Sequence, residues 1–144
     1  MEPRVNVITL AVDDLERALV FYRDGLGLQT QGVVASDLVD EETGAAGAIV
    51  IFNLDSGLIL ALYPRSELAK DAAVAAGPPH SGRFSLGQLV ASRAEVDTML
   101  AQAAAAGAVV TPPRNRPWGI YSGYFRDPDG HLWEIIWNPS RTSD

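Results

Sequence analysis

The side chain best placed for chemistry in this 144-residue chain is Glu134, in the C-terminal run HLWEIIWN. Alternation along a strand would put Glu134 on one face with Leu132 and Ile136, and the two tryptophans of the run on the opposite face. A carboxyl group that loses hydration among apolar neighbours holds its proton more tightly, so it can act as a general acid or base. We therefore predict Glu134 as the catalytic residue, if the protein is an enzyme.

The candidate ligand contacts are aromatic, cationic and amide side chains. We predict ligand contacts at Trp118, Tyr121, Tyr124, Gln88, Phe52, Arg114 and Arg116. Trp118 lies in a loop outside any amphipathic stripe, which favours stacking on a ligand. An alternative is that the aromatic residues of this loop seal a dimer interface.

Two of these candidates depend on how the chain folds locally. The arginines of PPRNRPWG are two residues apart and could receive an anionic ligand. Phe52 shares a strand face with Val50 and Leu54, whereas Ile49, Ile51 and Asn53 share the other. Alternation alone leaves open which face lines a cavity.

Metal-ligating residues are few. The chain has no cysteine, which removes thiolate ligands and disulfides. His131 follows an Asp-Pro-Asp-Gly turn, where a polar residue commonly begins the next strand, and His80 lies in a Pro-rich connector. We expect no cofactor, with a divalent metal as the alternative.

Composition limits the classes of partner. The formal net charge is −7, which argues against nucleic acid because such surfaces need clustered Lys and Arg. No apolar run approaches the roughly 20 residues that span a bilayer, and the N-terminus lacks the pattern of a secretory signal. We expect a cytoplasmic protein whose partner is a small molecule.

The elements that position these residues occur in the same order twice. Each half reads strand, helix, then three strands, with capping-box spacing at Asp13–Glu16 and at Ser92–Glu95. The predicted strands after the first helix are Gln29–Ser36, GAIVIFNL and LILALY, and the acidic stretch DLVDEETGAAG between the first two is an exposed turn. The predicted fold is α+β: two tandem βαβββ modules whose curved sheets surround a cavity, with helices on the outer face. Module one covers about 4–66, the connector about 67–82 with a short helix, and module two about 83–139, in a single domain over 1–144.

The stretches VITLAVDDLERALVFYRDGLGL and GYFRDPDGHLWEIIWNP resemble the opening and closing signatures of the vicinal oxygen chelate superfamily. That superfamily includes glyoxalase I, bleomycin-resistance proteins, fosfomycin-resistance enzymes and extradiol dioxygenases. The resemblance implies a homodimer and a divalent metal held by His, Glu or Gln at four strand positions. Those positions fall here on Val7, on Ala61 or Tyr63, on Leu86 or Gln88, and on Glu134. Of these residues, Glu134 is a strong ligand and Gln88 a weak one. Two ligands do not hold a divalent cation tightly, so the chain departs from the metal-binding pattern that the resemblance implies.

Three functions follow. The first is a glyoxalase-like or bleomycin-resistance-like protein that binds a small organic molecule in the sheet cavity without a tightly bound metal. The second is a divalent-metal-dependent lyase, isomerase or dioxygenase, which requires ligands that the sequence does not offer. The third is a metal-independent enzyme with Glu134 as general base, for which Arg114 and Arg116 are weak candidates as oxyanion partners. The sequence does not identify the ligand, a reaction or a pathway.

Overall fold

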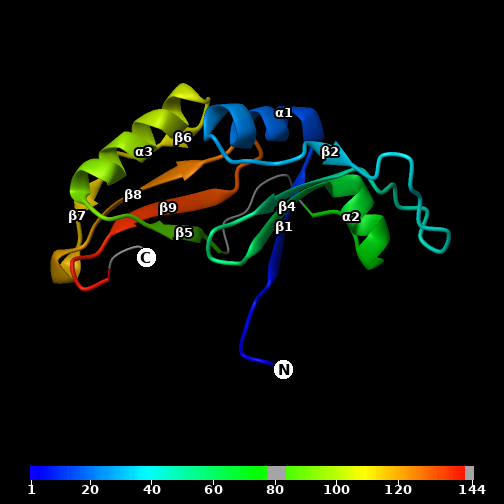
Figure 1. Cartoon of the computed structure of the whole chain (residues 1–144), viewed down its shortest axis with the longest axis horizontal. Coiled ribbons are helices and arrows are strands. Elements are labelled where there is room, and N and C mark those ends of the chain that lie inside the picture. The colour runs from blue at the N-terminus through cyan, green and yellow to red at the C-terminus, as the bar shows by residue number, and fades with distance from the viewer. Residues whose placement is uncertain (78–83, 142–144) are drawn as a thin grey trace. The chain divides into compact units, whose positions relative to one another are not determined.

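The computed structural model describes residues 1–77 and 84–141. The chain divides into two compact units, Met1–Pro79 and His80–Asp144. Each unit contains one mixed sheet with helices packed against it (Figure 1). No helix in the described part of the chain is both long and apolar enough to cross a membrane.

The N-terminal unit has four strands in the order β1-β4-β3-β2. Strands β1 and β4 are parallel, and the other neighbours are antiparallel. Helix α1 continues directly into a π-helical segment, and α2 follows β4. The elements are β1 (Val7–Val12), α1 (Leu15–Leu19), the π-helical segment (Val20–Gly25), β2 (Val33–Val34), β3 (Ile49–Asn53), β4 (Ile59–Pro64) and α2 (Arg65–Ala72).

The core of this unit lies between the sheet and α1. Alternate residues of β1 face it, and Leu10 is 1% exposed. Leu10 is directly opposite Leu62 in β4. The helical segment supplies buried Ala18, Leu19 and Tyr22, which form an apolar stripe. Burial of these side chains holds the helix on one face of the sheet.

The start of α1 differs by one residue from the capping box that the sequence suggests. Asp14 is the N-cap, because its Oδ1 accepts a hydrogen bond of 3.0 Å from the N–H of Arg17. Asp13 instead pairs with Arg65 at the start of α2, with 2.8 Å between Oδ1 and Nε. From the sequence, either of the two adjacent aspartates could cap the helix. In the structure, Asp14 caps it and Asp13 forms the ion pair with Arg65.

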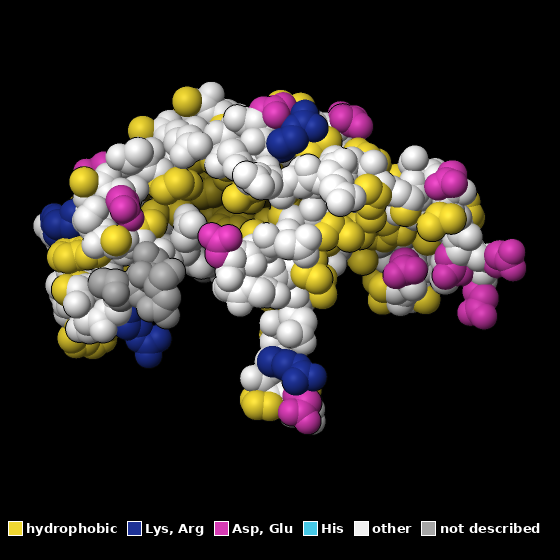
Figure 2. Space-filling view, viewed as in Figure 1, with side chains coloured by type: hydrophobic (Ala, Val, Ile, Leu, Met, Phe, Trp, Pro, Cys, Tyr) yellow, Lys and Arg dark blue, Asp and Glu magenta, His cyan; other side chains and the backbone are white. Residues whose placement is uncertain are grey.

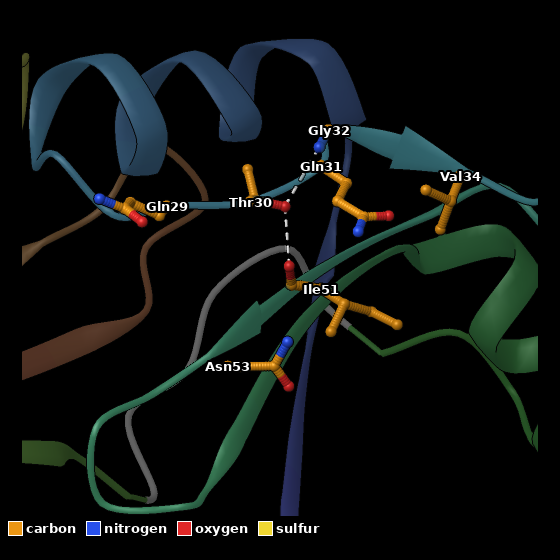
Figure 3. Close-up of a pocket in the computed structure, with 7 residues that line it drawn as sticks. All are labelled: Gln29, Thr30, Gln31, Gly32, Val34, Ile51 and Asn53. Carbon is orange, nitrogen blue, oxygen red and sulfur yellow. Dashed lines mark hydrogen bonds between the residues drawn. The ribbon is translucent and has the colours of Figure 1, made fainter.

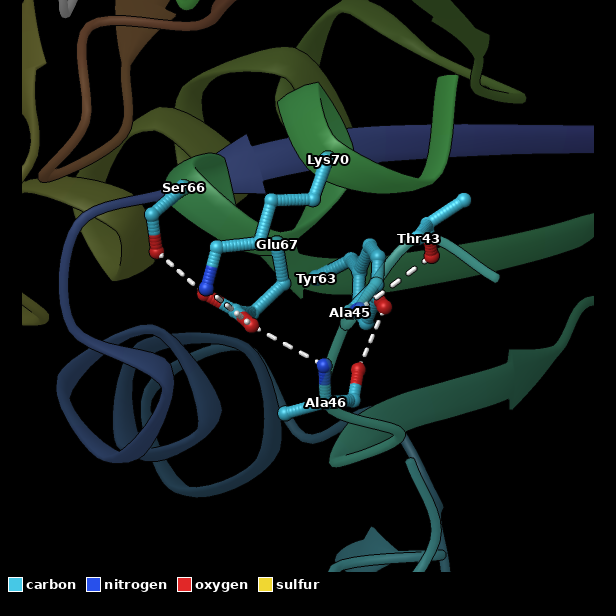
Figure 4. Close-up of polar contacts among 7 residues, drawn as sticks. All are labelled: Thr43, Ala45, Ala46, Tyr63, Ser66, Glu67 and Lys70. Carbon is cyan, nitrogen blue, oxygen red and sulfur yellow. Dashed lines mark hydrogen bonds and ion pairs between the residues drawn. The ribbon is translucent and has the colours of Figure 1, made fainter. Parts of the chain in front are cut away.

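The acidic stretch between β2 and β3 projects from one end of the sheet (Figure 1), where Figure 2 shows acidic side chains gathered on the surface. Most of it is exposed, as expected of a turn, but Ala45 is 2% exposed. The backbone of Ala46 is held on both sides: its N–H donates to Glu67 at 2.9 Å, and its carbonyl accepts from the Tyr63 hydroxyl (Figure 4). The loop is therefore anchored to β4 and α2.

The C-terminal unit repeats the order strand, helix, strands. Its main strands run β5-β9-β8-β6, with β7 also paired to β8. Strands β5 and β9 are parallel, and β8 is antiparallel to β9, β6 and β7. The elements are β5 (Leu86–Leu89), α3 (Arg93–Ala105), β6 (Val109–Val110), β7 (Arg114–Asn115), a 3-10 turn (Pro117–Gly119), β8 (Tyr121–Arg126) and β9 (Leu132–Trp137).

Helix α3 begins where the sequence predicts. The hydroxyl of Ser92 accepts a 3.1 Å hydrogen bond from the N–H of Glu95, and the Glu95 carboxylate accepts one of 2.8 Å from the N–H of Ala91. The helix packs closely on β8: a Cβ built on Gly123 would lie only 2.5 Å from Cδ1 of Leu100. Glycine at this position lets the helix approach the strand.

The predicted α+β architecture of two βαβββ modules is confirmed. The strand expected over Gln29–Ser36 is reduced to β2, and β7 and the 3-10 turn are additional. The helix expected in the connector is α2, which begins at Arg65. His80 lies outside the described residues. A single domain with one cavity shared by both modules stays a prediction.

Candidate functional site

Helix α3 packs on one face of the C-terminal sheet, and Glu134 lies on the other face. Residues directly across neighbouring strands point to the same face, so Glu134 shares its face with Tyr124 of β8 and Gly87 of β5. The other face packs on α3, because Gly123 approaches Leu100 there. We call the first surface the Glu134 face.

A compact polar cluster lies on this face. The Ser122 hydroxyl donates a hydrogen bond of 2.9 Å to Oε2 of Glu134. Nη1 of Arg116 lies 3.5 Å from the same hydroxyl oxygen and 4.0 Å from Oε2 of Glu134. Ser122 is 1% exposed, whereas the side chains of Arg116 and Glu134 are 29% and 20% exposed. Ser122 thus forms the floor of the cluster, and the two charged groups are open to solvent above it.

Local backbone structure explains why Arg116 reaches Glu134. Strand β7 places Arg114 directly opposite Ser122, so Arg114 is on the Glu134 face. Arg116, two residues later, remains extended at φ −117° and ψ 168°, and it therefore returns to the same side. Its N–H then donates to the carbonyl of Ile120 at 2.6 Å, which closes the turn around Trp118.

Trp118 has an unusual conformation at the tip of this turn. Its φ is +62° and its side chain is 88% exposed. A non-glycine residue in the left-handed region carries a steric cost, and such residues are common at binding sites. An exposed, strained tryptophan beside the arginines fits the predicted stacking role better than a core role.

Three of the predicted ligand contacts do not lie on the Glu134 face. Gln88 is directly opposite Ile135, which points toward α3, so it is not on the Glu134 face. Phe52 is fully buried in the other unit, with its ring 6.0 Å from that of Tyr22. Tyr121 faces α3, because its hydroxyl donates to Asp97 at 2.6 Å and the Arg93 guanidinium lies 4.1 Å from its ring centroid.

The hydrogen bond to Asp97 also sets the acidity of Tyr121. The carboxylate accepts a hydrogen bond from the phenolic O–H, which stabilises the protonated form and raises the pKa of Tyr121 above its ordinary value near 10. Desolvation and the charge of Asp97 raise the pKa further, while Arg93 lowers it. Tyr121 is a structural link between β8 and α3.

The residues present do not fit the divalent metal that the superfamily resemblance implies. Gln88 and Glu134 lie on opposite faces of the sheet, so they cannot share an ion. Over residues 1–77 and 84–141, no group of three or more His, Cys, Asp or Glu is close enough to hold a metal. The Oε2 atom of Glu134 already accepts from Ser122 and lies beside a guanidinium. His131 belongs to the preceding turn, where its N–H donates to Asp127 at 2.8 Å.

The N-terminal unit contains a groove of about 550 Å³ between β3 and the segment before β2. Its lining is uncharged and consists of Gln29, Thr30, Gln31, Gly32, Val34, Ile51 and Asn53. The Thr30 hydroxyl donates to the carbonyl of Ile51 at 2.7 Å and accepts from the N–H of Gly32 at 3.2 Å. Figure 3 shows Gln31 directed toward β3, on which Ile51 and Asn53 lie.

This groove settles which face of β3 is open. Ile51 is opposite Ala61, and Asn53 is opposite Ile59, on the face away from Phe52. The sequence placed these residues together by alternation, but it carried no signal for their exposure. The positive φ of Gly32 and the side-chain bond from Thr30 form the turn that builds the groove, and neither follows from periodicity.

Comparison with known proteins agrees with this fold. The family model described as Glyoxalase/Bleomycin resistance protein/Dioxygenase superfamily matches residues 4–135. A glyoxalase-related enzyme from Fulvimarina pelagi is 31% identical, with a TM-score of 0.77 over 95% of this chain and 89% of that one. A lactoylglutathione lyase from Agrobacterium tumefaciens is 26% identical, with a TM-score of 0.63 over 94% and 93%. A fosfomycin resistance protein from Listeria monocytogenes is 22% identical and shares the fold, with a TM-score of 0.67 over 96% and 95%. No curated protein sequence matches the chain significantly.

Proposed function

Because the chain belongs to the Glyoxalase/Bleomycin resistance protein/Dioxygenase superfamily, we propose that it binds a small organic molecule on its Glu134 face without a tightly bound metal. The observation that carries this proposal is the Arg116–Ser122–Glu134 cluster. It presents one cation and one anion, both partly open to solvent, over a buried hydroxyl group. Paired charges of this kind orient a ligand, as the few polar groups of a small-molecule site commonly do.

The surroundings support a ligand of modest size. Tyr124 lies directly opposite Glu134, and Trp118 is exposed at the turn that follows Arg116. Solved relatives include proteins whose names refer to small organic compounds, lactoylglutathione and fosfomycin. The groove of about 550 Å³ in the N-terminal unit has the volume of a small-molecule pocket and is a separate candidate site within that unit.

A metal-independent reaction is the second candidate function, favoured by the 4.0 Å approach of Arg116 to Glu134. Glu134 would accept a proton from the ligand, and the Arg116 guanidinium would stabilise the negative charge left on it. In this case, Glu134→Gln would abolish turnover of a bound compound in addition to weakening its binding.

The test combines a ligand screen with a metal assay on the tag-free full chain. We expect compounds that raise the unfolding temperature of the wild type and of Gln88→Ala, whose side chain is on the other face, but not of Glu134→Gln. A set of hits that all stabilise Glu134→Gln as strongly as the wild type would overturn the location of the site.

The metal assay adds Mn²⁺, Ni²⁺, Zn²⁺ or Fe²⁺ and measures the metal that remains after dialysis. We expect none to be retained in stoichiometric amount. If the wild type retains one ion per chain and Glu134→Ala does not, the protein would instead be a metal-dependent lyase, isomerase or dioxygenase.

A further inference from the structure

The gap between Arg116 and Glu134 indicates what kind of ligand group fits. At 4.0 Å, Nη1 and Oε2 are too far apart for a direct hydrogen bond. Across the cluster, the one group that bridges them is the Ser122 hydroxyl, which donates to Glu134 at 2.9 Å and receives a long contact of 3.5 Å from Arg116. A hydroxyl group can do both because it is a donor and an acceptor.

Much of the hydrogen-bonding capacity of the two charged groups is still available. A guanidinium has five N–H donors, and in the described residues the side-chain contacts of Arg116 involve Nη1 only. A carboxylate has two acceptor oxygens, and the side-chain contacts of Glu134 involve Oε2 only. The outer edges of both groups are therefore able to bind a ligand.

The local charge favours an anion. Arg114, Arg116 and Glu134 lie on one face, so two positive charges stand beside one negative charge. This balance contrasts with the net charge of −7 over the whole chain. A planar carboxylate matches a guanidinium through two parallel hydrogen bonds, whereas Glu134 would repel an anion placed directly against it. The part of a ligand next to Glu134 must therefore be a hydrogen-bond donor.

On the basis of the proposed function, we infer that the Glu134 face binds a 2-hydroxy carboxylate, with its carboxylate on Arg116 and its hydroxyl group donating to Glu134. The carboxylate and the hydroxyl group of such a ligand are on adjacent carbon atoms. Their short separation matches that of Arg116 and Glu134, which are close enough for the single Ser122 hydroxyl to contact both. Arg116 supplies the positive charge for the ligand oxygens. Trp118, at the turn after Arg116, stacks on an aromatic substituent where the ligand has one.

Isothermal titration of the full chain with three matched probes tests this inference. The probes are 3-phenyllactate, 3-phenylpropanoate, which lacks the hydroxyl group, and methyl 3-phenyllactate, which lacks the charge. We expect 3-phenyllactate to bind about tenfold more tightly than either, which is about 1.4 kcal/mol and close to the lower end of the range for a hydrogen bond to a charged group. Equal affinity for all three probes would overturn the inference.

Variants assign each contact. Glu134→Gln should weaken the binding of 3-phenyllactate about tenfold and leave the affinity for 3-phenylpropanoate unchanged, because only the first probe donates a hydrogen bond to the carboxylate. Arg116→Ala should weaken the binding of both acids about tenfold or more, but not the binding of the methyl ester. The matched control is Arg114→Ala, which removes a nearby charge without the contact to Ser122, and should change either affinity only about two- to threefold. An Arg114→Ala effect as large as that of Arg116→Ala would contradict the assignment.

Failure of this inference can be told from failure of the proposed function. If compounds from the screen bind at Glu134 but 3-phenyllactate does not, a small-molecule site exists and the ligand class is wrong. If 3-phenyllactate binds the wild type and Glu134→Gln equally, its hydroxyl group does not contact Glu134, and the inference is also wrong. Circular dichroism on each variant confirms that loss of binding is not loss of folding.

Discussion

Oε1 of Glu67 accepts a hydrogen bond of 2.9 Å from the backbone N–H of Ala46, which lies 21 residues earlier in the chain. The same carboxylate accepts from the Ser66 hydroxyl at 2.8 Å and lies 3.2 Å from the Lys70 ammonium group (Figure 4). Tyr63 completes the anchor through the carbonyl of Ala46. Glu67 therefore holds an acidic loop against β4 and α2, although it lies outside the candidate site.

The first prediction concerns stability at acid pH. The N–H of Ala46, then Ser66 and Lys70, lowers the pKa of Glu67 to about 2 from an ordinary value of 4.5. A carboxyl group whose pKa is lower in the folded chain adds stability above its unfolded pKa, and this contribution is lost as pH falls from about 4.5 to about 2. The unfolding temperature of the wild type should exceed that of Glu67→Gln at pH 7, and the difference should shrink through this window.

Glu41→Gln is the matched control, because Glu41 is an exposed glutamate of the same loop. It should unfold like the wild type at every pH. A difference between the wild type and Glu67→Gln that stays constant from pH 7 to pH 2 would show that the Glu67 charge does not hold the loop.

The second prediction tests the packing of α3 on β8. An alanine at position 123 would place its Cβ 2.5 Å from Cδ1 of Leu100 and 3.1 Å from the backbone Cα of Pro113. Since the Pro113 backbone cannot rotate away, Gly123→Ala should lower the free energy of unfolding by about 1–3 kcal/mol, as overpacking does. Denaturant unfolding measures the change.

Gly87→Ala provides the comparison within the same sheet. Its Cβ would meet Cδ1 of Ile136 at 3.4 Å, which is near ordinary contact. We expect no loss of stability there, and up to about 1 kcal/mol of gain from the reduced freedom of the unfolded chain. Equal losses in both variants would mean that glycine in these strands matters for another reason than the approach of α3.

Much of the fold could be predicted from the sequence because local signals and tertiary packing agree there. Helix α3 is an example: its start follows the capping-box spacing of Ser92 and Glu95, and the helix buries Val96 and Ala103 fully. Alternation also separated the two faces of β9 correctly. Glu134 lies on the face away from α3, and Trp137 lies on the face that packs on α3, with its ring centroid 5.9 Å from the Arg93 guanidinium.

The site was harder to predict because its geometry depends on register and on loops. Gln88 and Gly87 are adjacent in sequence, and a shift of one residue decides which of them shares a face with Glu134. Tyr121 belongs to the helix side because Asp97 is one turn into α3, a contact that no local pattern shows. The approach of Arg116 to Glu134 requires β7, a strand of only two residues.

The third prediction concerns the alkaline titration of Tyr121. The hydrogen bond to Asp97 raises the pKa of Tyr121, so the folded chain holds this proton more tightly than the unfolded chain. The contribution to stability is fully present below the ordinary pKa near 10 and is lost as pH rises through the higher folded value. Tyrosinate absorbance of the wild type should therefore include late titration by Tyr63, whose pKa desolvation raises, and by a second late group, which is Tyr121.

Asp97→Asn should move this late group back toward 10, because the carboxylate that holds the proton is gone. Tyr121→Phe should remove it entirely and leave ligand binding on the Glu134 face unchanged. If Tyr121→Phe weakens the binding of 3-phenyllactate as strongly as Arg116→Ala does, then Tyr121 contacts the ligand and its placement beside α3 is not its functional position.

The fourth prediction is that Trp118 lowers the stability of the fold but strengthens ligand binding. Its φ of +62° costs a non-glycine residue about 1–2 kcal/mol, and its 88% exposure means that the side chain gains little from packing. Trp118→Gly removes the steric cost, although the greater freedom of unfolded glycine offsets about 0.5–1 kcal/mol. We expect this variant to be up to about 1 kcal/mol more stable than the wild type in denaturant unfolding and to bind 3-phenyllactate more weakly.

Trp118→Phe separates these two effects. Phenylalanine keeps an aromatic face for stacking and keeps the steric cost, so its stability and affinity should both remain close to those of the wild type. A Trp118→Gly variant that loses stability would show that the indole makes contacts that hold the turn. A variant that gains stability but keeps full affinity would show that Trp118 is strained for a purpose other than this ligand, such as contact with a second chain.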